Sequence, residues 1–341
     1  MLRTRGLAGF SPQRTLSPVN TYRTLAVYVA LALVAAAALA LSILSGSVEI
    51  GWRDVWSGSG GLAHDLVFEL RLPRALGAFG AGAILALAGV LMQVLLRNPL
   101  ADPFVMGVSG GAAVAALGAM LLGLTGIAVD IAAALGALAA ILLVFGLAHE
   151  EGSWAPTRLL LTGIVIAAGT GAVVSMLLAL SDDTRLRGML FWLMGDVSLG
   201  TRPGLLLTVA ALAILVCVPL ARHLNLLARG ELQARVLGAP VEALKIGIFI
   251  ASSVLTAVAV TSAGTIGFVG LVTPHLVRLM IGSDHRIVLP ACALLGGTLV
   301  MLADLCARTL VAPRQLPVGA LTALVGVPLF LVLMRRTTRS V

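Results

Sequence analysis

Apolar segments of about 20 residues recur along the whole chain, and this recurrence constrains the fold more than any other feature. A segment of that length spans the hydrocarbon core of a bilayer as an α-helix. Of the 341 residues, 59% are hydrophobic and only 11% are charged, so the chain lacks the polar surface that a soluble protein needs. The sequence therefore predicts an all-α polytopic membrane protein.

We expect about ten membrane-spanning helices. Their approximate ranges are 22–44, 74–96, 104–123, 127–148, 158–180, 204–221, 245–263, 267–281, 287–307 and 318–334. The eighth is shorter than a full crossing because Gly264, Gly267 and Pro274 interrupt it. An interrupted helix of this kind is expected where protein rather than lipid surrounds it.

The basic residues indicate the orientation of the chain. Fourteen of the 23 Lys and Arg residues fall on one side of the expected spans, eight fall on the other side, and Arg278 lies within a span. Because cytoplasmic loops carry the excess of Lys and Arg, we expect both termini in the cytoplasm. The expected parts are a cytoplasmic tail (1–21), one ten-helix domain (22–336) and a second cytoplasmic tail (337–341).

Two connecting segments are long enough to have a role of their own. One lies on the outer side over residues 45–73, and the other lies on the cytoplasmic side over residues 222–244. The cytoplasmic segment alternates leucines with charged residues, which predicts short amphipathic helices. We expect a break between them at Gly230 and an end at Gly238.

The same sequence argues against several other classes. The net charge of +8 comes from bases at the ends of apolar segments, so it indicates topology rather than nucleic-acid binding. The only lysine, Lys245, does not belong to the Gly-Lys-Ser/Thr ending of a P-loop. The three cysteines and five histidines lack the spacing of metal ligands. We expect no catalytic residue, no metal site and no cofactor in this chain.

Several ordered strings go beyond composition. They include Arg-Leu-Pro-Arg at 71–74, Arg-Asn-Pro-Leu-Ala-Asp-Pro at 97–103, Gly-Val-Ser-Gly-Gly at 107–111, the segment 264–278, Asp-His-Arg at 284–286 and Leu-Pro-Val-Gly at 316–319. Together they resemble the FecCD family, the permease subunits of binding-protein-dependent ABC importers for ferric siderophores, haem and vitamin B12. The resemblance extends from about residue 25 to residue 336, and it implies a multi-pass protein of the inner or plasma membrane of a bacterium.

The resemblance implies a set of partners and a cargo. The partners are a second permease subunit (a copy or a homologue), two cytoplasmic ABC ATPase subunits that bind ATP and Mg, and an extracytoplasmic substrate-binding protein. The implied cargo is an iron chelate, with a ferric siderophore as the first expectation and haem or vitamin B12 as alternatives. A proton-coupled secondary transporter is the other class, and it would need carboxylates within the spans, where the chain offers Asp130 and Asp304.

The resemblance also implies roles for two sets of residues in the connecting segments. The residues that match the docking arginines for the binding protein are Arg71, Arg74 and Arg308. The residues that fall in the ATPase-coupling segment are Glu231, Ala234, Leu237 and Gly238. The alternatives are arginines that reach to lipid headgroups and an amphipathic helix that lies on the membrane surface.

Two further sets concern the translocation path. The residues that match a cytoplasmic gate are Asn98, Leu100 and Thr157, and turn formation by Asn-Pro is the alternative for the first two. The residues implied to line the path are Thr162, Gly163, Gly169 and Thr170, with helix packing as the alternative. For Asp130, Asp304, His275 and Arg278 we expect structural pairing rather than a proton relay, including a pair between Asp304 and Arg308.

Overall fold

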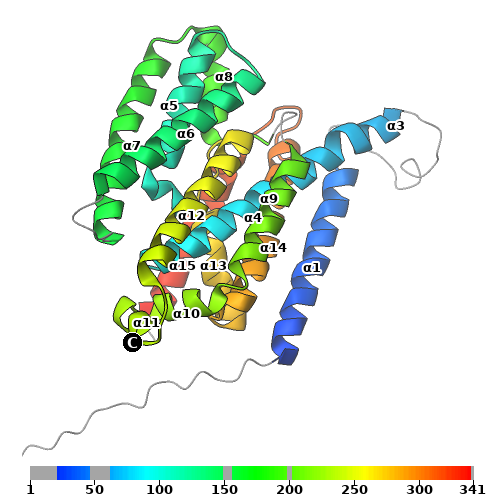
Figure 1. The fold of residues 1–341 in the computed structure, drawn as a ribbon. Helices are drawn as coiled ribbons and strands as arrows, with labels where there is room; N and C mark the ends of the chain where they lie inside the picture. The colour runs from blue at the N-terminus through cyan, green and yellow to red at the C-terminus, as the bar shows by residue number, and fades with distance from the viewer. Residues whose placement is uncertain (1–20, 47–61, 149–155, 198–201, 339–341) are drawn as a thin grey trace, which may run out of the picture.

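The computed structural model describes residues 21–46, 62–148, 156–197 and 202–338. Within them every regular element is helical, and the helices form a bundle (Figure 1). The apolar helices are α1 (Thr21–Leu44), α4 (Leu72–Leu95), α5 (Val108–Leu121), α6 (Ile127–Ala148), α7 (Pro156–Ala179), α9 (Pro203–Cys217), α12 (Val241–Ala263), α13 (Val269–Ile281), α14 (His285–Thr309) and α15 (Val318–Thr338). Residues 1–20 and 339–341 of the expected tails (1–21 and 337–341) and residues 47–61 of the segment 45–73 lie outside the described residues.

The all-α membrane fold is confirmed, and each of the ten expected segments is helical. Six helices in the described ranges are long and apolar enough to cross a membrane. Helix α9 reaches the length of a crossing only together with α10 (Ala221–Arg229), and the two are bent by 71° at the break between them. The other three, α5, α13 and α15, are shorter apolar helices, and the shortness of α13 follows from the glycines that precede it.

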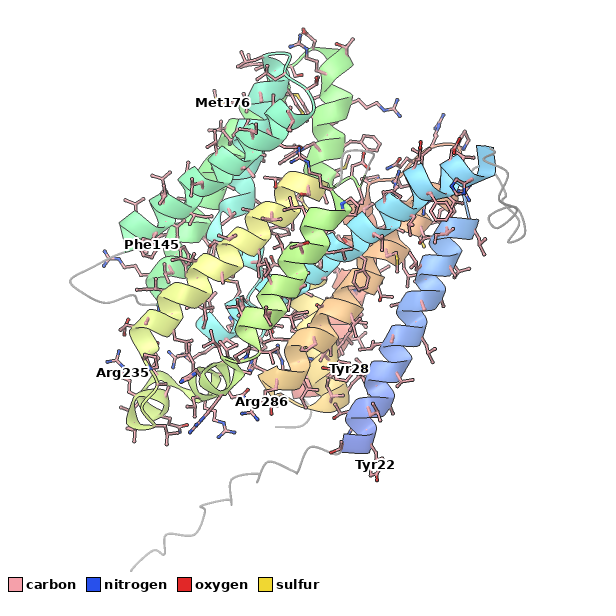
Figure 2. The ribbon with its side chains drawn as sticks, turned by 45° about the vertical axis from the view of Figure 1, so that its right-hand side comes forward. Tyr22, Tyr28, Phe145, Met176, Arg235 and Arg286 are labelled. Atoms are coloured by element: carbon pink, nitrogen blue, oxygen red, sulfur yellow. The ribbon has the colours of Figure 1, made fainter. Side chains whose placement is uncertain are left out.

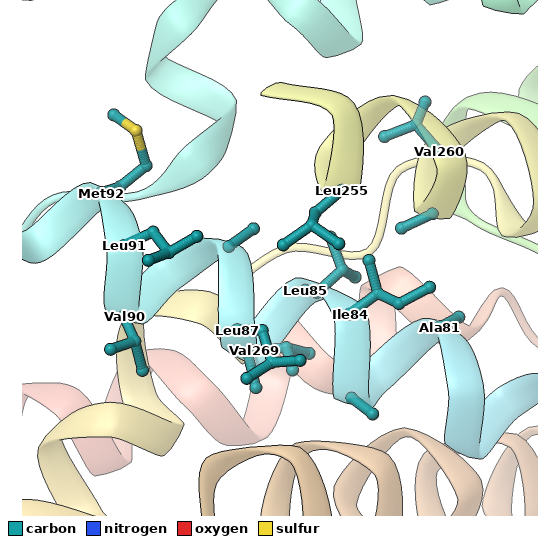
Figure 3. Close-up of a cluster of buried hydrophobic side chains, with 14 of the residues drawn as sticks. Ala81, Ile84, Leu85, Leu87, Val90, Leu91, Met92, Leu255, Val260 and Val269 are labelled. Carbon is teal, nitrogen blue, oxygen red and sulfur yellow. The ribbon is translucent and has the colours of Figure 1, made fainter. Parts of the chain in front are cut away.

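Helix α4 occupies the centre of the bundle, where it contacts α14, α12, α9 and α13 (Figure 1). It can approach them closely because its glycines face other backbones. A Cβ on Gly82 would lie 2.2 Å from the carbonyl oxygen of Gly296 in α14, and a Cβ on Gly89 would lie 2.0 Å from that of Gly270 in α13. Figure 3 shows the apolar side chains around this core, with Leu255 of α12 beside the α4 residues.

A second group consists of α5, α6 and α7, which lie side by side at one edge of the bundle (Figure 1). The crossing of α5 and α6 again places two glycines face to face, because a Cβ on Gly111 would lie 2.4 Å from the carbonyl oxygen of Gly136. Helix α7 is only 11% buried over its most apolar stretch, whereas α4 is 89% buried. The outer surface of α7 is therefore free to face lipid or another subunit.

Two regions that were expected to be loops contain helices. Helix α8 (Asp183–Met194) lies between α7 and α9, and its signals were Asp182 before it and Gly195 (φ +80°) after it. Before α4, helix α3 (Leu62–Asp65) and the π-helical turn η1 (Leu66–Arg71) lead directly into it, so the expected loop does not extend to residue 73. Pro73 did not force a start at 74, because proline is tolerated in the first turn of a helix.

The described chain has two distinct ends. Helix α10, helix α11 (Glu231–Val236) and the start of α1 lie at one end, here called the α11 end, while α3 and α8 lie at the opposite end (Figure 1). Figure 2 shows Arg235 and Arg286 at the α11 end and Met176 at the far end. Both arginines belong to the basic set that the sequence places in the cytoplasm.

Candidate functional site

The three arginines expected to dock a binding protein lie together at the end opposite α11. Arg74 of α4 donates from Nη2 and Nε to the Oδ1 of Asp304 at 2.8 and 3.0 Å. Arg308 donates from Nε to the Oδ2 of the same carboxylate at 3.1 Å, which confirms the expected pair on α14. Asp304 is almost fully buried, so two cations compensate its charge.

Arg71 and Arg308 also hold the end of α1. Arg71 Nη1 donates to the carbonyl oxygens of Ile43 and Leu44 at 2.8 and 3.0 Å, and Arg308 Nη2 donates to that of Ser42 at 3.3 Å. The last carbonyls of a helix lack partners within it and carry partial negative charge, so a guanidinium stabilises them. We call Arg71, Arg74, Arg308 and Asp304 the Asp304 cluster. All three arginines thus have partners within the described chain, and their docking role stays a prediction.

At the α11 end, residues 222–244 contain the two expected short helices, and Gly230 (φ +137°) separates them as predicted. Asn225 fixes α10 to the turn before α14: its Nδ2 donates to Asp284 Oδ1 at 2.8 Å, and its Oδ1 accepts from the backbone N–H of His285 at 3.0 Å. Burial alone would raise the pKa of Asp284, but the hydrogen bonds from Asn225 and from the Arg286 N–H outweigh burial and lower it.

The expected coupling residues of α11 face in different directions. Ala234 is fully buried, whereas Leu237 is 62% exposed. Gly238 has φ +79° and open space around its Cα. Glu231 points inward, with Oε1 3.7 Å from Arg97 Nη2 and Oε2 3.5 Å from Lys245 Nζ. Only part of this set is therefore presented to a partner on the outside of the bundle.

The sequence did not single out Lys245 and Arg97 as site residues. Lys245 is 4% exposed and lies 3.1 Å from Glu242 Oε2 as well as 3.5 Å from Glu231 Oε2. A buried lysine requires such partners, because an uncompensated charge away from water is costly. The available signal was that the only lysine of the chain lies among apolar residues near the start of a span.

The expected gate residues lie in the turn after α4 and at the start of α7. Asn98 Oδ1 accepts from the backbone N–H of Leu100 at 2.9 Å, so the turn-forming role is present. Leu100 is 44% exposed, and Thr157 is exposed in the first turn of α7. Nothing in this geometry tests the gate itself, which stays a prediction.

The four residues of α7 expected to line the path differ in how closely other elements pack against them. Gly163 packs against the backbone of η2 (Pro103–Met106), since a Cβ there would lie 2.5 Å from the carbonyl oxygen of Val105. Thr170 donates to the carbonyl of Ile166 within its own helix and packs on Gly110 of α5. Gly169 has open space around it, and Thr162 is half-buried. Gly169 is thus the member of the set with the most open surroundings.

The ionisable residues within the expected spans interact with nearby helix ends or polar side chains. Asp130 lies in the first turn of α6, where a carboxylate interacts favourably with the helix dipole. Arg278 donates to Gln93 Oε1 of α4, which is a structural partner of the kind expected for it. Within the described residues, no group of three or more His, Cys, Asp or Glu side chains could hold a metal ion.

These features define a class: a multi-pass helical membrane protein with polar, partner-accessible segments at both ends. The sequence model of the FecCD transport family matches residues 31–336, and the chain belongs to that family. It is therefore a permease subunit of the ABC-importer class.

Relatives and a solved structure agree with this assignment. The chain is 42% identical over 309 residues to the hemin transport system permease protein HmuU of Yersinia pestis, covering 86% of this chain and 91% of the relative. It is 38% identical over 315 residues to the vitamin B12 import system permease protein BtuC of Salmonella typhi, covering 91% and 94%. An inward-facing structure of a metal-chelate type ABC transporter superposes with a TM-score of 0.79 at 32% identity, covering 92% of this chain and 99% of the other.

Proposed function

We propose that this permease subunit moves an iron chelate, a ferric siderophore in the first place, from the outer side of the membrane into the cytoplasm. Separate ATPase subunits hydrolyse the ATP that drives the movement. The relatives named for hemin and vitamin B12, and the structure named for a metal chelate, support a large chelate as cargo. Haem and vitamin B12 are the alternative cargoes.

The observation that carries the proposal is the solvent-exposed apolar surface of α11 and of the residue that follows it. Leu232 is 77% exposed, Val236 is 79% exposed and Leu237 is 62% exposed, and all three belong to one short stretch at the α11 end. The basic residues beside them favour a cytoplasmic location, where three exposed apolar side chains suit a protein partner, with the membrane surface as the alternative. An ATPase subunit is the partner that a transport subunit without a P-loop requires.

The remaining surfaces suit the other proposed partners. The exposed side of α7 offers a face for a second permease subunit or for the path between two subunits. The Asp304 cluster offers arginines to an acidic binding protein, since a guanidinium has five N–H groups and those of Arg74 and Arg308 are only partly used. We propose both roles, together with cytoplasmic termini.

Transport assays test the cargo. In a strain that lacks this chain, uptake of labelled ferric siderophore, haem and vitamin B12 is measured before and after the gene is restored. We expect siderophore uptake to return, and to stop when ATP is depleted but not when the proton gradient is collapsed. Restoration of haem or vitamin B12 uptake alone would replace the siderophore by that cargo, and dependence on the proton gradient would favour a secondary transporter.

Association kinetics test the docking role. The binding protein is applied to the permease in lipid discs at two salt concentrations. The side chains of Arg74 and Arg308 are 14% and 12% exposed. If these exposed parts meet acidic residues of the binding protein, Arg74→Glu and Arg308→Glu should slow association. The effect should shrink at higher salt, because charges in contact with solvent are screened over about 8–10 Å at ordinary ionic strength. Unchanged rates for folded variants would leave the arginines with only their structural role.

A further inference from the structure

The turn after α4 contains a strained residue. Helix α4 ends in two nested hydrogen bonds. The N–H of Arg97 donates to the carbonyl of Val94, and the N–H of Asn98 donates to that of Gln93. This arrangement places Arg97 in the left-handed region, with φ +48°, where glycine is usual because a Cβ is disfavoured. A non-glycine residue retained in this conformation directs attention to what its side chain does.

The side chain of Arg97 reaches the segment that faces the proposed ATPase. Its Nη2 lies 3.7 Å from Oε1 of Glu231, the first residue of α11. The other oxygen of Glu231 lies 3.5 Å from Nζ of the buried Lys245 in α12. We call Arg97, Glu231 and Lys245 the Glu231 bridge. It places one carboxylate between cations from two different parts of the bundle.

The two sides of the bridge have different surroundings. On one side, α11 exposes its apolar face to a partner, as described above. On the other side, Arg97 is followed directly by Asn98, whose side chain fixes the backbone of Leu100. The end of α4 is also held to α13, because Gln93 Nε2 donates to the carbonyls of Gly270 and Leu271 at 3.3 and 3.4 Å. A displacement of α11 therefore has a direct electrostatic route to the 98–100 turn.

We infer that Glu231 is a positioning residue that transmits movement of α11 to the 98–100 turn through Arg97, while Lys245 keeps its carboxylate in place. The inference rests on the proposed function, since it requires an ATPase subunit that moves α11. It gives Glu231 a role within the permease rather than at the ATPase surface. It also explains why the strained position after α4 holds arginine instead of glycine.

A neighbouring ion pair provides a matched control. Arg235 of α11 lies 2.5 Å from Glu242 of α12, and both side chains are more than a third exposed. This pair links α11 to α12. Glu242 also lies 3.1 Å from Lys245 of the Glu231 bridge, so the control variant changes Arg235 alone and leaves the contact between Glu242 and Lys245 in place. Among the described contacts Arg235 has none with the turn after α4, so Arg235→Ala should leave transmission to that turn unchanged.

The experiment uses the permease assembled with its ATPase subunits in lipid discs. Leu100→Cys is introduced in a Cys306→Ser background, because Cys306 is exposed while Cys217 and Cys292 are buried. The labelling rate of this cysteine by a maleimide is measured without nucleotide and with ATP plus vanadate. ATPase co-purification, ATP hydrolysis and thermal unfolding are measured on the same samples. None of these readouts requires the cargo to be known.

When the Glu231 bridge is intact, we expect the labelling rate to change at least about fivefold on addition of nucleotide. This factor is the lower end of typical coupling between two sites. Arg97→Gly should abolish that change while ATPase binding and hydrolysis persist. Its thermal stability should be equal or higher, because glycine relaxes the strained turn. Glu231→Gln should act like Arg97→Gly, the double variant should be no worse than either, and Arg97→Lys and Arg235→Ala should retain the change.

Other results overturn the inference. The inference is wrong if the labelling rate still changes with nucleotide in Arg97→Gly, or if the effects of Arg97→Gly and Glu231→Gln simply add. It is also wrong if Arg97→Gly loses ATPase binding, or if the labelling rate does not change with nucleotide in the Leu100→Cys protein with an intact bridge. Failure of the proposed function is a separate result, because the starting protein would then bind no ATPase subunit at all.

Discussion

Helices α4 and α7 have the same length, 24 residues each, and both are rich in glycine and alanine, yet they have opposite surroundings. The most apolar stretch of α4 is 89% buried, while that of α7 is 11% buried. In α4, Gly82 and Gly89 lie against the backbones of other helices. In α7, Gly163 packs in this way but Gly169 does not. Small residues therefore mark close packing in one helix and leave an open surface in the other.

The largest effect is expected at the centre of α4. Gly89→Ala places a Cβ 2.0 Å from the carbonyl oxygen of Gly270, and neither backbone can move without separating α4 from α13. We expect a loss of about 3 kcal/mol or more, at the upper end of overpacking costs, although alanine favours helix more than glycine does. Thermal unfolding in detergent measures the loss. An unchanged melting temperature would contradict the buried position of α4.

A somewhat smaller effect is expected at the start of α4. Asp304→Asn leaves Arg308 without a carboxylate and Arg74 with only that of Asp196, 4.0 Å away, and because both arginines retain some contact with solvent we expect a loss of about 2 kcal/mol. Asp182→Asn, at the exposed residue before α8, is the matched control and should change stability little. Equal melting temperatures for the two variants would show that the Asp304 cluster does not hold α4.

A third comparison lies within α7. Gly163→Ala should cost about 1–2 kcal/mol, since its Cβ would lie 2.5 Å from the carbonyl oxygen of Val105. Gly169→Ala meets open space and should be neutral or slightly stabilising. Measuring unfolding and uptake together separates packing from path lining. If Gly169→Ala lowers uptake in a stable protein, Gly169 belongs to a functional surface.

The smallest effect concerns pH at the turn between α4 and η2. Burial raises the pKa of Asp102 to about 6, although the hydrogen bond from the Phe104 N–H opposes the rise. The folded state thus favours the protonated carboxyl, so the stability it contributes is present below pH 3.8 and is lost as the pH rises through about 6. Melting temperatures should fall modestly from pH 5 to pH 7, and Asp102→Asn should flatten this dependence. An equally steep dependence in the variant would assign it to another group.

Much of the architecture was predictable because it depends on local sequence. The spans, the break at Gly230 and the short α13 follow from apolar length, glycine and proline alone. The pair between Asp304 and Arg308 was predictable for the same reason, since residues four apart share a helix face. Helix α8 was not predicted, because its apolar content is modest and the Asp and Gly at its ends were not used as helix start and stop signals.

The candidate sites divide in the same way. The sequence placed Glu231 and Leu237 in one segment but gave no indication that one faces inward while the other is exposed. It also gave no reason to connect Arg97 with Glu231, which lie far apart along the chain and meet only because α4 and α11 end at the same side of the bundle.

The sequence by itself determined that this chain spans a membrane many times, where its ten apolar segments lie, and the family to which it belongs. These properties depend on matching each segment to the bilayer thickness and to local backbone preferences. Only the tertiary structure decided that α4 is central and α7 peripheral, and that Asp304 and Glu231 each lie between two cations. The physical reason is that lipid tails are as apolar as the side chains of neighbouring helices, so hydropathy does not distinguish a lipid-facing surface from a packed one.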